Sequence, residues 1–172
     1  DEHTRRIRKL LSDVKYQQTI TEVTDLLAIK SPLPGKFYFY LAQAQKGLRK
    51  RNLANAALRK FINHYPGHSR VQEALFNIGR NFWNTGYYRD GLKYFETSIG
   101  KNPHSNLANQ ARFFIGKMHE EKKRHSQATS YYEALTNNFR SSEYAERAAW
   151  QLGWINYTKG DFQKSFDYFG KS

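Results

Sequence analysis

The side chains best suited to metal chemistry in this chain are two pairs of histidines. His64 and His68 are four residues apart, a spacing that places two ligands on one helix face, but Pro66 lies between them and breaks a helix. His119 and His125 are six residues apart and fall on different faces of a helix. The sequence therefore predicts no metal site.

Catalytic motifs are also missing from the sequence. Glu120 and Glu121 are adjacent carboxylates, but they lie in a Lys-rich stretch and are better explained as a solvated helix face. The chain has no Gly-x-Ser-x-Gly elbow, no P-loop and no Gly-x-Gly-x-x-Gly loop. Cysteine is absent, which excludes disulfides and thiolate zinc sites. We therefore expect no catalytic residue, no cofactor and no enzyme activity in this segment.

The chain is strongly basic, and its charge is unevenly distributed. It has 28 Lys and Arg against 15 Asp and Glu, a formal net charge of +13. Six cations fall within fifteen residues that contain no Asp or Glu: Lys46, Arg49, Lys50, Arg51, Arg59 and Lys60. This basic patch has two interpretations, a solvated outer face or a surface that contacts an anionic partner.

The hydropathy of the sequence indicates no membrane-spanning segment. No apolar run approaches the ~20 residues that such a helix needs. The first residues are charged and no apolar stretch follows them, so no signal peptide is evident. The lack of cysteine is compatible with a periplasm or a cytoplasm and does not decide between them.

The positions of small residues show an internal repeat. Gly79, Gly116 and Gly153 are spaced by 37 residues, and Ala42 lies one further period upstream. A period of this size is typical of stacked supersecondary units. Such arrays mostly hold partners, so the functional question becomes which surface the array presents.

One unit of the repeat, residues 71–103, has the pattern of two helices. Apolar residues three and four apart run from Leu75 to Phe82, and a second apolar stripe follows the break at Gly86. Each unit also has two small residues twelve positions apart, one in each helix, which we expect to face each other where the helices close. These pairs are Ala42 with Ala54, Gly79 with Gly91, Gly116 with Ala128, and Gly153 with Ser165.

This pattern resembles the tetratricopeptide repeat. Gly79, Phe82, Gly91, Phe95 and Pro103 match the small, aromatic and proline positions of that family. The resemblance covers residues 36–172 as four repeats and implies an all-α fold, a right-handed α-solenoid of antiparallel helix pairs. Residues 1–35 are expected to form one divergent helix pair ahead of them. Because the last repeat is incomplete, we expect a further domain of the same chain beyond residue 172.

The resemblance also implies a concave binding surface lined by the first helix of each pair. An aromatic ladder interrupted by cations would suit an extended peptide, glycan or single strand. Alternatively, the Phe side chains are core residues packed between neighbouring helices. The positions concerned are Phe39, Lys46, Phe76, Arg80, Trp83, Phe113, Lys117, Trp150, Trp154 and Tyr157.

A second resemblance rests on residues 142–162. Their Tyr-Ala-x-x-Ala-x-Trp-x-x-Gly-Trp-x-x-Tyr pattern followed by Gly-Asp-Phe, here with Ala148, Trp150, Gly153, Trp154 and Tyr157, looks like the helical-repeat region of bacterial soluble lytic murein transglycosylases. The catalytic Glu-Ser and Gly-Leu-Met-Gln motifs of those enzymes do not occur here. The resemblance therefore implies a non-catalytic, periplasmic scaffold region of a peptidoglycan-cleaving enzyme.

The sequence leaves two functional hypotheses open. In the first, the basic surface holds such an enzyme on the cell wall, whose peptide stems carry carboxylates. In the second, the chain is a tetratricopeptide adaptor of the envelope-assembly type that binds a protein or peptide in its concave groove. Nucleic acid is a weaker candidate, because helical repeats that read bases need polar side chains at fixed positions.

Overall fold

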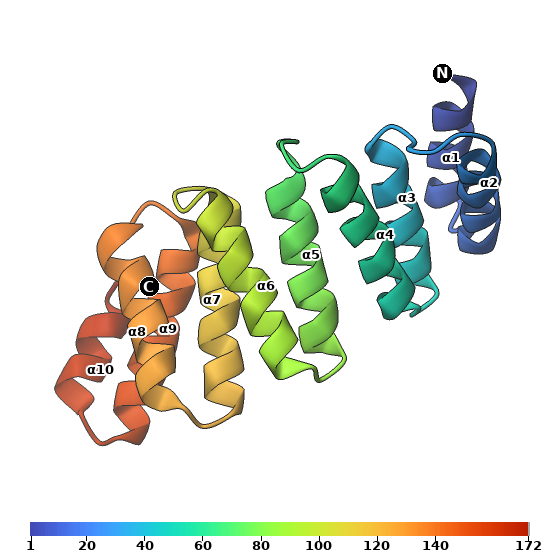
Figure 1. Cartoon of the computed structure of the whole chain (residues 1–172). Coiled ribbons are helices and arrows are strands. Elements are labelled where there is room, and N and C mark those ends of the chain that lie inside the picture. Colours follow the sequence, from blue (N-terminus) through green and yellow to red (C-terminus); the bar gives the residue numbers. More distant parts are fainter. Residues whose placement is uncertain (172) are drawn as a thin grey trace. The chain divides into compact units, whose positions relative to one another are not determined.

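The structure, a computed structural model, describes residues 1–171, and in that range it contains ten α-helices and no strand (Figure 1). The helices are α1 (Glu2–Ser12), α2 (Tyr16–Ile29), α3 (Lys36–Gly47), α4 (Arg51–His64), α5 (Val71–Asn84), α6 (Tyr88–Lys101), α7 (Asn106–Glu121), α8 (His125–Asn138), α9 (Glu143–Thr158) and α10 (Phe162–Phe169). None of these helices is long and apolar enough to cross a membrane. The expected all-α fold of helix pairs is confirmed.

The chain forms two compact units, with unit 1 comprising α1–α5 and unit 2 comprising α6–α10. The boundary lies between Tyr87 and Tyr88, at the turn inside the second predicted repeat. The pairing of Gly79 with Gly91 spans this boundary and stays a prediction. So does the division of the sequence into residues 1–35 and 36–172, whose last residue, Ser172, lies outside the described residues.

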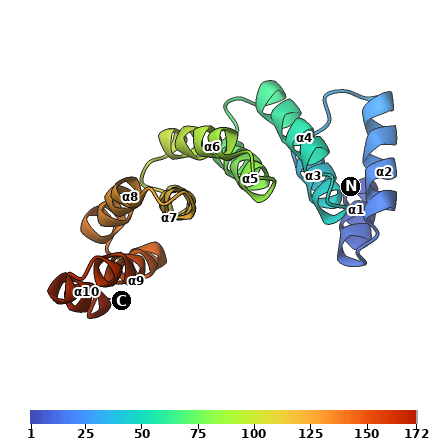
Figure 2. The same ribbon diagram turned by 90° about the horizontal axis from the view of Figure 1, so that it is seen from below.

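Within each unit, consecutive helices pack against one another. In unit 1, α2, α3, α4 and α5 contact in order, and α1 packs on α2 and α3. In unit 2, the series runs from α6 to α10, and α7 also contacts α9 (Figure 2). Contacts between neighbours in sequence are what an array of helix hairpins requires.

Five turns that follow α1, α3, α5, α7 and α9 share one backbone geometry. Each contains a residue with positive φ, namely Val14 (57°), Arg49 (59°), Gly86 (80°), Lys123 (57°) and Gly160 (80°). The last four of these positions are 37 residues apart. A left-handed residue after a helix lets the next backbone N–H groups bond to the helix's last carbonyls, which ends the helix and reverses the chain. The repeat is therefore visible in the turns as well as in the side chains.

Two of the small residues leave space into which a side chain of the second helix packs, so they serve as notches. The side chains that fill these notches differ from those expected. A Cβ placed on Gly116 would lie well under 3.0 Å from the Tyr132 ring, and one on Gly153 equally close to the Phe169 ring. The nearest neighbours are thus the large residues of the second helix rather than the small residues Ala128 and Ser165. Each ring packs over glycine backbone because no side chain intervenes.

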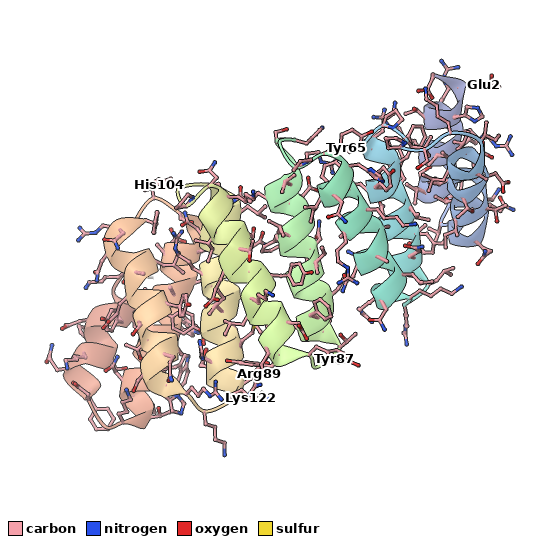
Figure 3. All side chains as sticks on the ribbon, viewed as in Figure 1. Glu2, Tyr65, Tyr87, Arg89, His104 and Lys122 are labelled. Carbon is pink, nitrogen blue, oxygen red and sulfur yellow. The ribbon has the colours of Figure 1, made fainter. Side chains whose placement is uncertain are left out.

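The loops between hairpins are fixed by local hydrogen bonds. Ser105 caps α7 and Ser142 caps α9, each accepting a backbone N–H through its side chain. Tyr65, which follows α4 (Figure 3), donates its hydroxyl to the carbonyl of Leu33 at 2.7 Å. This bond ties the loop before α3 to the end of α4, two of the helices that carry the site described below.

Candidate functional site

Two adjoining cavities lie on unit 1 between α3, α4 and α5. The central pocket, of about 180 Å³, is lined by Phe39, Ala42, Gln43, Lys46, Leu58, Arg70, Glu73, Asn77 and Asn81. The cationic pocket, of about 250 Å³, is lined by Lys46, Arg51, Asn77, Arg80, Asn81 and Asn84. The two cavities share Lys46, Asn77 and Asn81 and therefore adjoin; together they are called here the α3–α5 groove.

The helix hairpin explains why the three cations of the cationic pocket meet. Lys46 is in the last turn of α3, and Arg51 is the first residue of α4. The reversal of the chain at Arg49 places these two residues at the same end of the hairpin. Arg80 comes from α5, which packs on α4. All three cations therefore line one cavity although 34 positions separate the first from the last.

None of these cations has an acidic partner among the described residues. The six residues that line the cationic pocket include no carboxylate. The pKa of Lys46 is lowered, first by burial and then by the charges of Arg80 and Arg51. The Nε atom of Arg51 is buried and has no hydrogen-bond partner. The pocket thus concentrates positive charge that the protein itself leaves uncompensated.

The asparagine side chains provide a polar wall for the groove. Asn81 on α5 is buried, and its amide donates to the side-chain oxygen of buried Asn55 on α4 at 2.8 Å. This bond fixes the orientation of Asn81 and links the two helices. Asn77 and Asn84 lie one helical turn before and after it on the same face of α5. Such amides can donate to an anion or pair with a peptide backbone.

The one carboxylate of the central pocket is already neutralised. Glu73 receives two hydrogen bonds from the guanidinium of Arg70, at 2.6 and 2.9 Å. The pKa of Arg70 is raised mainly by this hydrogen bond. The Arg70 guanidinium also lies 3.6 Å from the centre of the Phe39 ring, over its face. Glu73 therefore does not neutralise Lys46 or the cationic pocket.

The structure supports the core alternative for the predicted Phe ladder. Phe39, Phe76 and Phe113 are 9%, 3% and 9% exposed. Phe113 belongs to the hydrophobic core of unit 2, where its ring packs against Tyr132 and Tyr144. These rings stabilise the packing of the helices and leave little surface for a ligand. Phe39 still contributes an edge to the central pocket.

The other predicted surface residues differ between the units. Trp83 is half-buried in unit 1. In unit 2, the Lys117 ammonium pairs with Glu120 at 3.2 Å and lies 3.4 Å from the amide oxygen of Gln151, so it is not free. Glu120 also accepts a hydrogen bond from Tyr132, which shows that it is a structural carboxylate and not simply part of a solvated face.

Three aromatic residues predicted on the last repeat form an exposed cluster. Trp150, Trp154 and Tyr157 are 48%, 46% and 51% exposed. Adjacent rings meet edge to face, with centroids 6.2 Å apart for the tryptophans and 5.6 Å apart for Trp154 and Tyr157. The cluster is an exposed, mainly aromatic face of α9 whose own polar atoms are two indole N–H groups and the Tyr157 hydroxyl.

The predicted basic patch separates into two parts. Lys46 and Arg51 line the cationic pocket, and Arg49 and Lys50 occupy the turn beside it. The remaining members, Arg59 and Lys60, are exposed on α4, about 12 Å further along at 1.5 Å per residue, and line neither cavity of the groove. Arg80, predicted from the repeat pattern, joins the first part.

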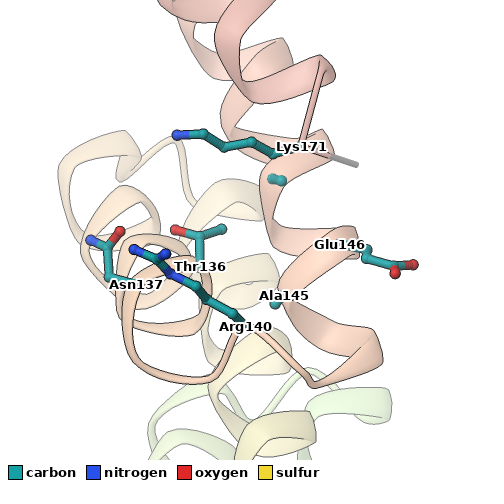
Figure 4. A pocket seen from close by; sticks show the side chains of 7 residues that line it. Thr136, Asn137, Arg140, Ala145, Glu146 and Lys171 are labelled. Carbon is teal, nitrogen blue, oxygen red and sulfur yellow. The ribbon is translucent and has the colours of Figure 1, made fainter.

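Unit 2 has its own larger cavity, of about 490 Å³, lined by Thr136, Asn137, Arg140, Ala145, Glu146, Ala149 and Lys171. Its cations, Arg140 and Lys171, are exposed and come from a loop and from the residue after the α10 cap. Figure 4 shows Glu146 pointing away from both. Among the described residues, no buried polar atom without a partner belongs to the lining of this cavity, so the α3–α5 groove is the better organised site.

No group of three or more metal-ligating side chains occurs in the described part of the chain. Of the histidines considered as ligands, His119 is buried, and its Nδ1 lies 3.0 Å from the hydroxyl of Tyr88 while its ring stacks on Tyr131. His119 is therefore a packing residue of unit 2.

The sequence pattern indicates the cations of the groove but not its amides. It does not single out Asn77, Asn81 and Asn84, nor the pairing of Arg70 with Glu73. A signal exists, because polar residues at 77, 81 and 84 recur at helical spacing on a helix whose other face is apolar. That spacing alone does not reveal that the three face Lys46 and Arg51.

Comparison with known proteins supports the repeat assignment. A family model described as a tetratricopeptide repeat matches residues 37–68, which span α3 and α4. No curated protein matches the chain significantly in sequence.

Several solved structures share the fold. MamA from Desulfovibrio magneticus RS-1 is 14% identical with a TM-score of 0.73, covering 98% of this chain and 90% of its own. A putative kinesin light chain of Podospora anserina with tetratricopeptide-like repeats is 10% identical with a TM-score of 0.72, covering 99% and 91%. PilF from Pseudomonas aeruginosa is 17% identical with a TM-score of 0.72, covering 99% and 73%. At these identities the likeness concerns the fold, which is that of a tetratricopeptide-like helical repeat.

Proposed function

We propose that this chain is a protein-interaction scaffold that binds an extended segment of a partner protein in the α3–α5 groove. The observation that carries the proposal is that the two pockets adjoin, with Lys46, Asn77 and Asn81 in the lining of both. The central pocket offers apolar edges from Phe39, Ala42 and Leu58, and the cationic pocket beside it offers uncompensated charge. A short peptide fits such a surface because a side chain can enter one pocket while a charged group enters the other.

The charge distribution favours an acidic partner. Unit 1 contains 15 Lys and Arg against 6 Asp and Glu, a net of +9, whereas unit 2 contains 13 against 9, a net of +4. Residues 26–72, which include all of α3 and α4, contain no Asp or Glu. The field around the groove therefore attracts anionic segments and speeds their association at low ionic strength.

The adaptor hypothesis is preferred to the cell-wall hypothesis. The family match and the structural relatives concern helical repeats, and there is no transglycosylase among the relatives named above. The resemblance of residues 142–162 to murein transglycosylases therefore has no further support, and neither does binding to peptidoglycan. Location in a bacterial envelope and a further domain after residue 172 stay predictions from the sequence.

The proposal can be tested without knowledge of the partner by selecting peptides from a phage-displayed library. Peptides selected on the full chain are measured by fluorescence polarisation against the wild type and two variants. Asn77→Trp places a large ring in the wall shared by both pockets, and Lys60→Trp places the same ring on the exposed face of α4. We expect binding to be lost in the first variant and retained in the second.

The comparison controls for charge and for folding. Lys60→Trp removes a cation outside the groove, whereas Asn77→Trp changes no charge. If binding depended only on net charge, Lys60→Trp would weaken it and Asn77→Trp would not. Thermal unfolding of both variants checks that the ring at position 77 does not disrupt α5. If folded Asn77→Trp binds the selected peptides as well as the wild type does, the groove is not the binding surface.

A further inference from the structure

The cationic pocket has a more specific chemistry than general attraction of acids. Three cations from three helices, Lys46, Arg51 and Arg80, line about 250 Å³ together with three amide side chains. Some cations elsewhere in the chain have a carboxylate partner close by in sequence, as Arg70 has Glu73 and Lys117 has Glu120. No ion pair or hydrogen bond compensates the three pocket cations within the described residues. The missing partner is an anion.

The hydrogen-bonding groups specify what kind of anion fits. The Arg51 Nε–H is buried without an acceptor, and a buried donor left unpaired is unfavourable. The guanidiniums of Arg51 and Arg80, the Lys46 ammonium and the amides of Asn77 and Asn84 are all donors. An occupant that bonds to several of these lining residues at once needs several acceptor oxygens around one centre. A planar carboxylate offers two oxygens and a single charge.

A phosphoryl group meets both requirements. A phosphomonoester carries about −1.5 to −2 charge at pH 7 and three acceptor oxygens, so it can bond to donors that approach from α3, α4 and α5 at once. Arginine guanidiniums suit this geometry because each can donate two parallel hydrogen bonds. We propose that the cationic pocket binds the phosphoryl group of a phosphomonoester.

The adjoining central pocket indicates what kind of molecule carries the phosphoryl group. Lys46, Asn77 and Asn81 belong to both pockets, so a chain that leaves the phosphoryl group can continue along the groove past Gln43 and the Phe39 edge. This step rests on the proposed peptide-binding function and identifies the segment as one that carries a phosphorylated residue. The pocket chemistry is the same for free inorganic phosphate, and the experiment separates the two sources.

The first measurement is an NMR titration of the full chain that follows the arginine Nε–H signals. The probes are inorganic phosphate, N-acetyl-phosphoserine amide, N-acetyl-serine amide, dimethyl phosphate and acetate, at matched ionic strength. We expect saturable shifts of Arg51 and Arg80 with the first two probes and none with the others. Equal binding of acetate, or of the singly charged dimethyl phosphate, would overturn the requirement for a doubly charged phosphoryl group.

Matched variants test whether the pocket itself is responsible. Arg80→Gln and Arg51→Gln each remove a pocket cation, and Arg59→Gln removes one from α4 outside the pocket. We expect the first two to weaken phosphoserine-amide binding by about tenfold or more, as loss of a charge-assisted hydrogen bond predicts, and Arg59→Gln to leave it within about twofold. Equal losses in all three would show a diffuse field effect and refute a built site. Because Arg51 begins α4, Arg80→Gln is decisive if Arg51→Gln fails to fold.

The peptide experiment distinguishes failure of this inference from failure of the proposed function. Phosphorylated and unphosphorylated forms of a groove-selected peptide containing Ser are compared in fluorescence polarisation. Tighter binding of the phosphorylated form, lost in Arg80→Gln, supports both claims. Groove binding without any preference for phosphate refutes the phosphoryl site and leaves the scaffold function standing. Binding of inorganic phosphate with no peptide binding supports the pocket as a phosphate site and refutes the peptide-binding function.

Discussion

At the residue scale, two kinds of polar side chain can be compared: those that pair inside a unit, and the cations of the cationic pocket, which have no acidic partner among the described residues. His119 represents the first kind. It is 6% exposed, contacts Tyr88 from α6 and stacks on Tyr131 from α8. Burial lowers its pKa, the charge of Arg124 lowers it further, and Glu96 opposes the shift. The neutral ring is therefore the form that unit 2 accommodates.

The stability of unit 2 should consequently depend on the protonation of His119. A lowered folded-state pKa means that the unfolded chain takes up the proton first, so stability falls as pH drops below about 6.5 and levels off below the folded pKa. His119→Phe keeps a ring against Tyr131 but removes Nδ1, at a cost of about 1 kcal/mol at pH 8. In urea unfolding, the difference in free energy of unfolding between the wild type and the variant should be smaller at pH 5.5 than at pH 8. A gap that widens would contradict the assignment.

Lys46 represents the second kind, a cation placed beside other cations. Burial lowers its pKa, and Arg80 and Arg51 lower it further. Arg80→Gln should therefore raise the pKa of Lys46, and Arg51→Gln should raise it by a smaller amount. The side-chain carbon and proton shifts of Lys46, followed by NMR against pH, measure this directly. Lys60→Gln, outside the pocket, should leave the value unchanged, and an unchanged value in Arg80→Gln would show that the charges are not neighbours.

At the element scale, the α7–α8 and α9–α10 hairpins each combine a glycine under a packed ring with a left-handed turn residue. The notch of the α7–α8 hairpin is Gly116, over which the Tyr132 ring lies. Gly116→Ala should force that ring away, at about 1–3 kcal/mol for overpacking, against about 1 kcal/mol gained in helix propensity. Gly100→Ala is the control, because a Cβ there meets nothing within 4 Å. Chemical denaturation should show Gly116→Ala less stable and Gly100→Ala neutral or more stable. An unchanged stability of Gly116→Ala would mean that the Tyr132 ring moves aside without a cost in free energy.

The turns can be tested with two adjacent lysines. Lys123 has a φ of 57°, whereas Lys122 has an ordinary φ of −92°. Glycine tolerates the left-handed region, and the equivalent turns after α5 and α9 already have it. Lys123→Gly should stabilise the protein by up to about 1 kcal/mol, and Lys122→Gly should destabilise it by several tenths. If thermal unfolding showed Lys122→Gly to be more stable than Lys123→Gly, the left-handed conformation assigned to Lys123 would be wrong.

The sequence predicts these elements well because they depend on local rules. The 37-residue spacing of Gly116 and Gly153 marks two notches, and the same spacing recurs in the turns at Lys123 and Gly160. Which residue fills a notch was less predictable, because the ring of Tyr132 competes with Ala128 for the same space. The exposure of the Phe ladder also depends on how neighbouring hairpins pack, and spacing along one helix does not determine that.

The site was only half predictable for a related reason. Lys46, Arg51 and Arg80 stand out in the sequence as cations in an acid-free region or at groove positions. Asn77 and Asn81 are marked only by their helical spacing, which is a weak signal because asparagines on a helix are usually solvated. Their role follows only from the packing of α5 on α4, which the hydrogen bond between Asn81 and Asn55 fixes.

At the scale of the whole molecule, two surfaces compete as the binding face. The α3–α5 groove of unit 1 combines apolar edges, amides and unpaired cations. The aromatic cluster of Trp150, Trp154 and Tyr157 in unit 2 is apolar and carries no charge. The net charge of +9 on unit 1 against +4 on unit 2 favours the groove for an acidic partner.

Chemical-shift mapping with a peptide selected on the full chain separates these surfaces in one experiment. The groove predicts that the largest shifts fall on Gln43, Lys46, Asn77 and Arg80, with the indole N–H signals of Trp150 and Trp154 unchanged. Shifts concentrated on those two tryptophans, with the groove signals unmoved, would contradict the assignment of binding to unit 1.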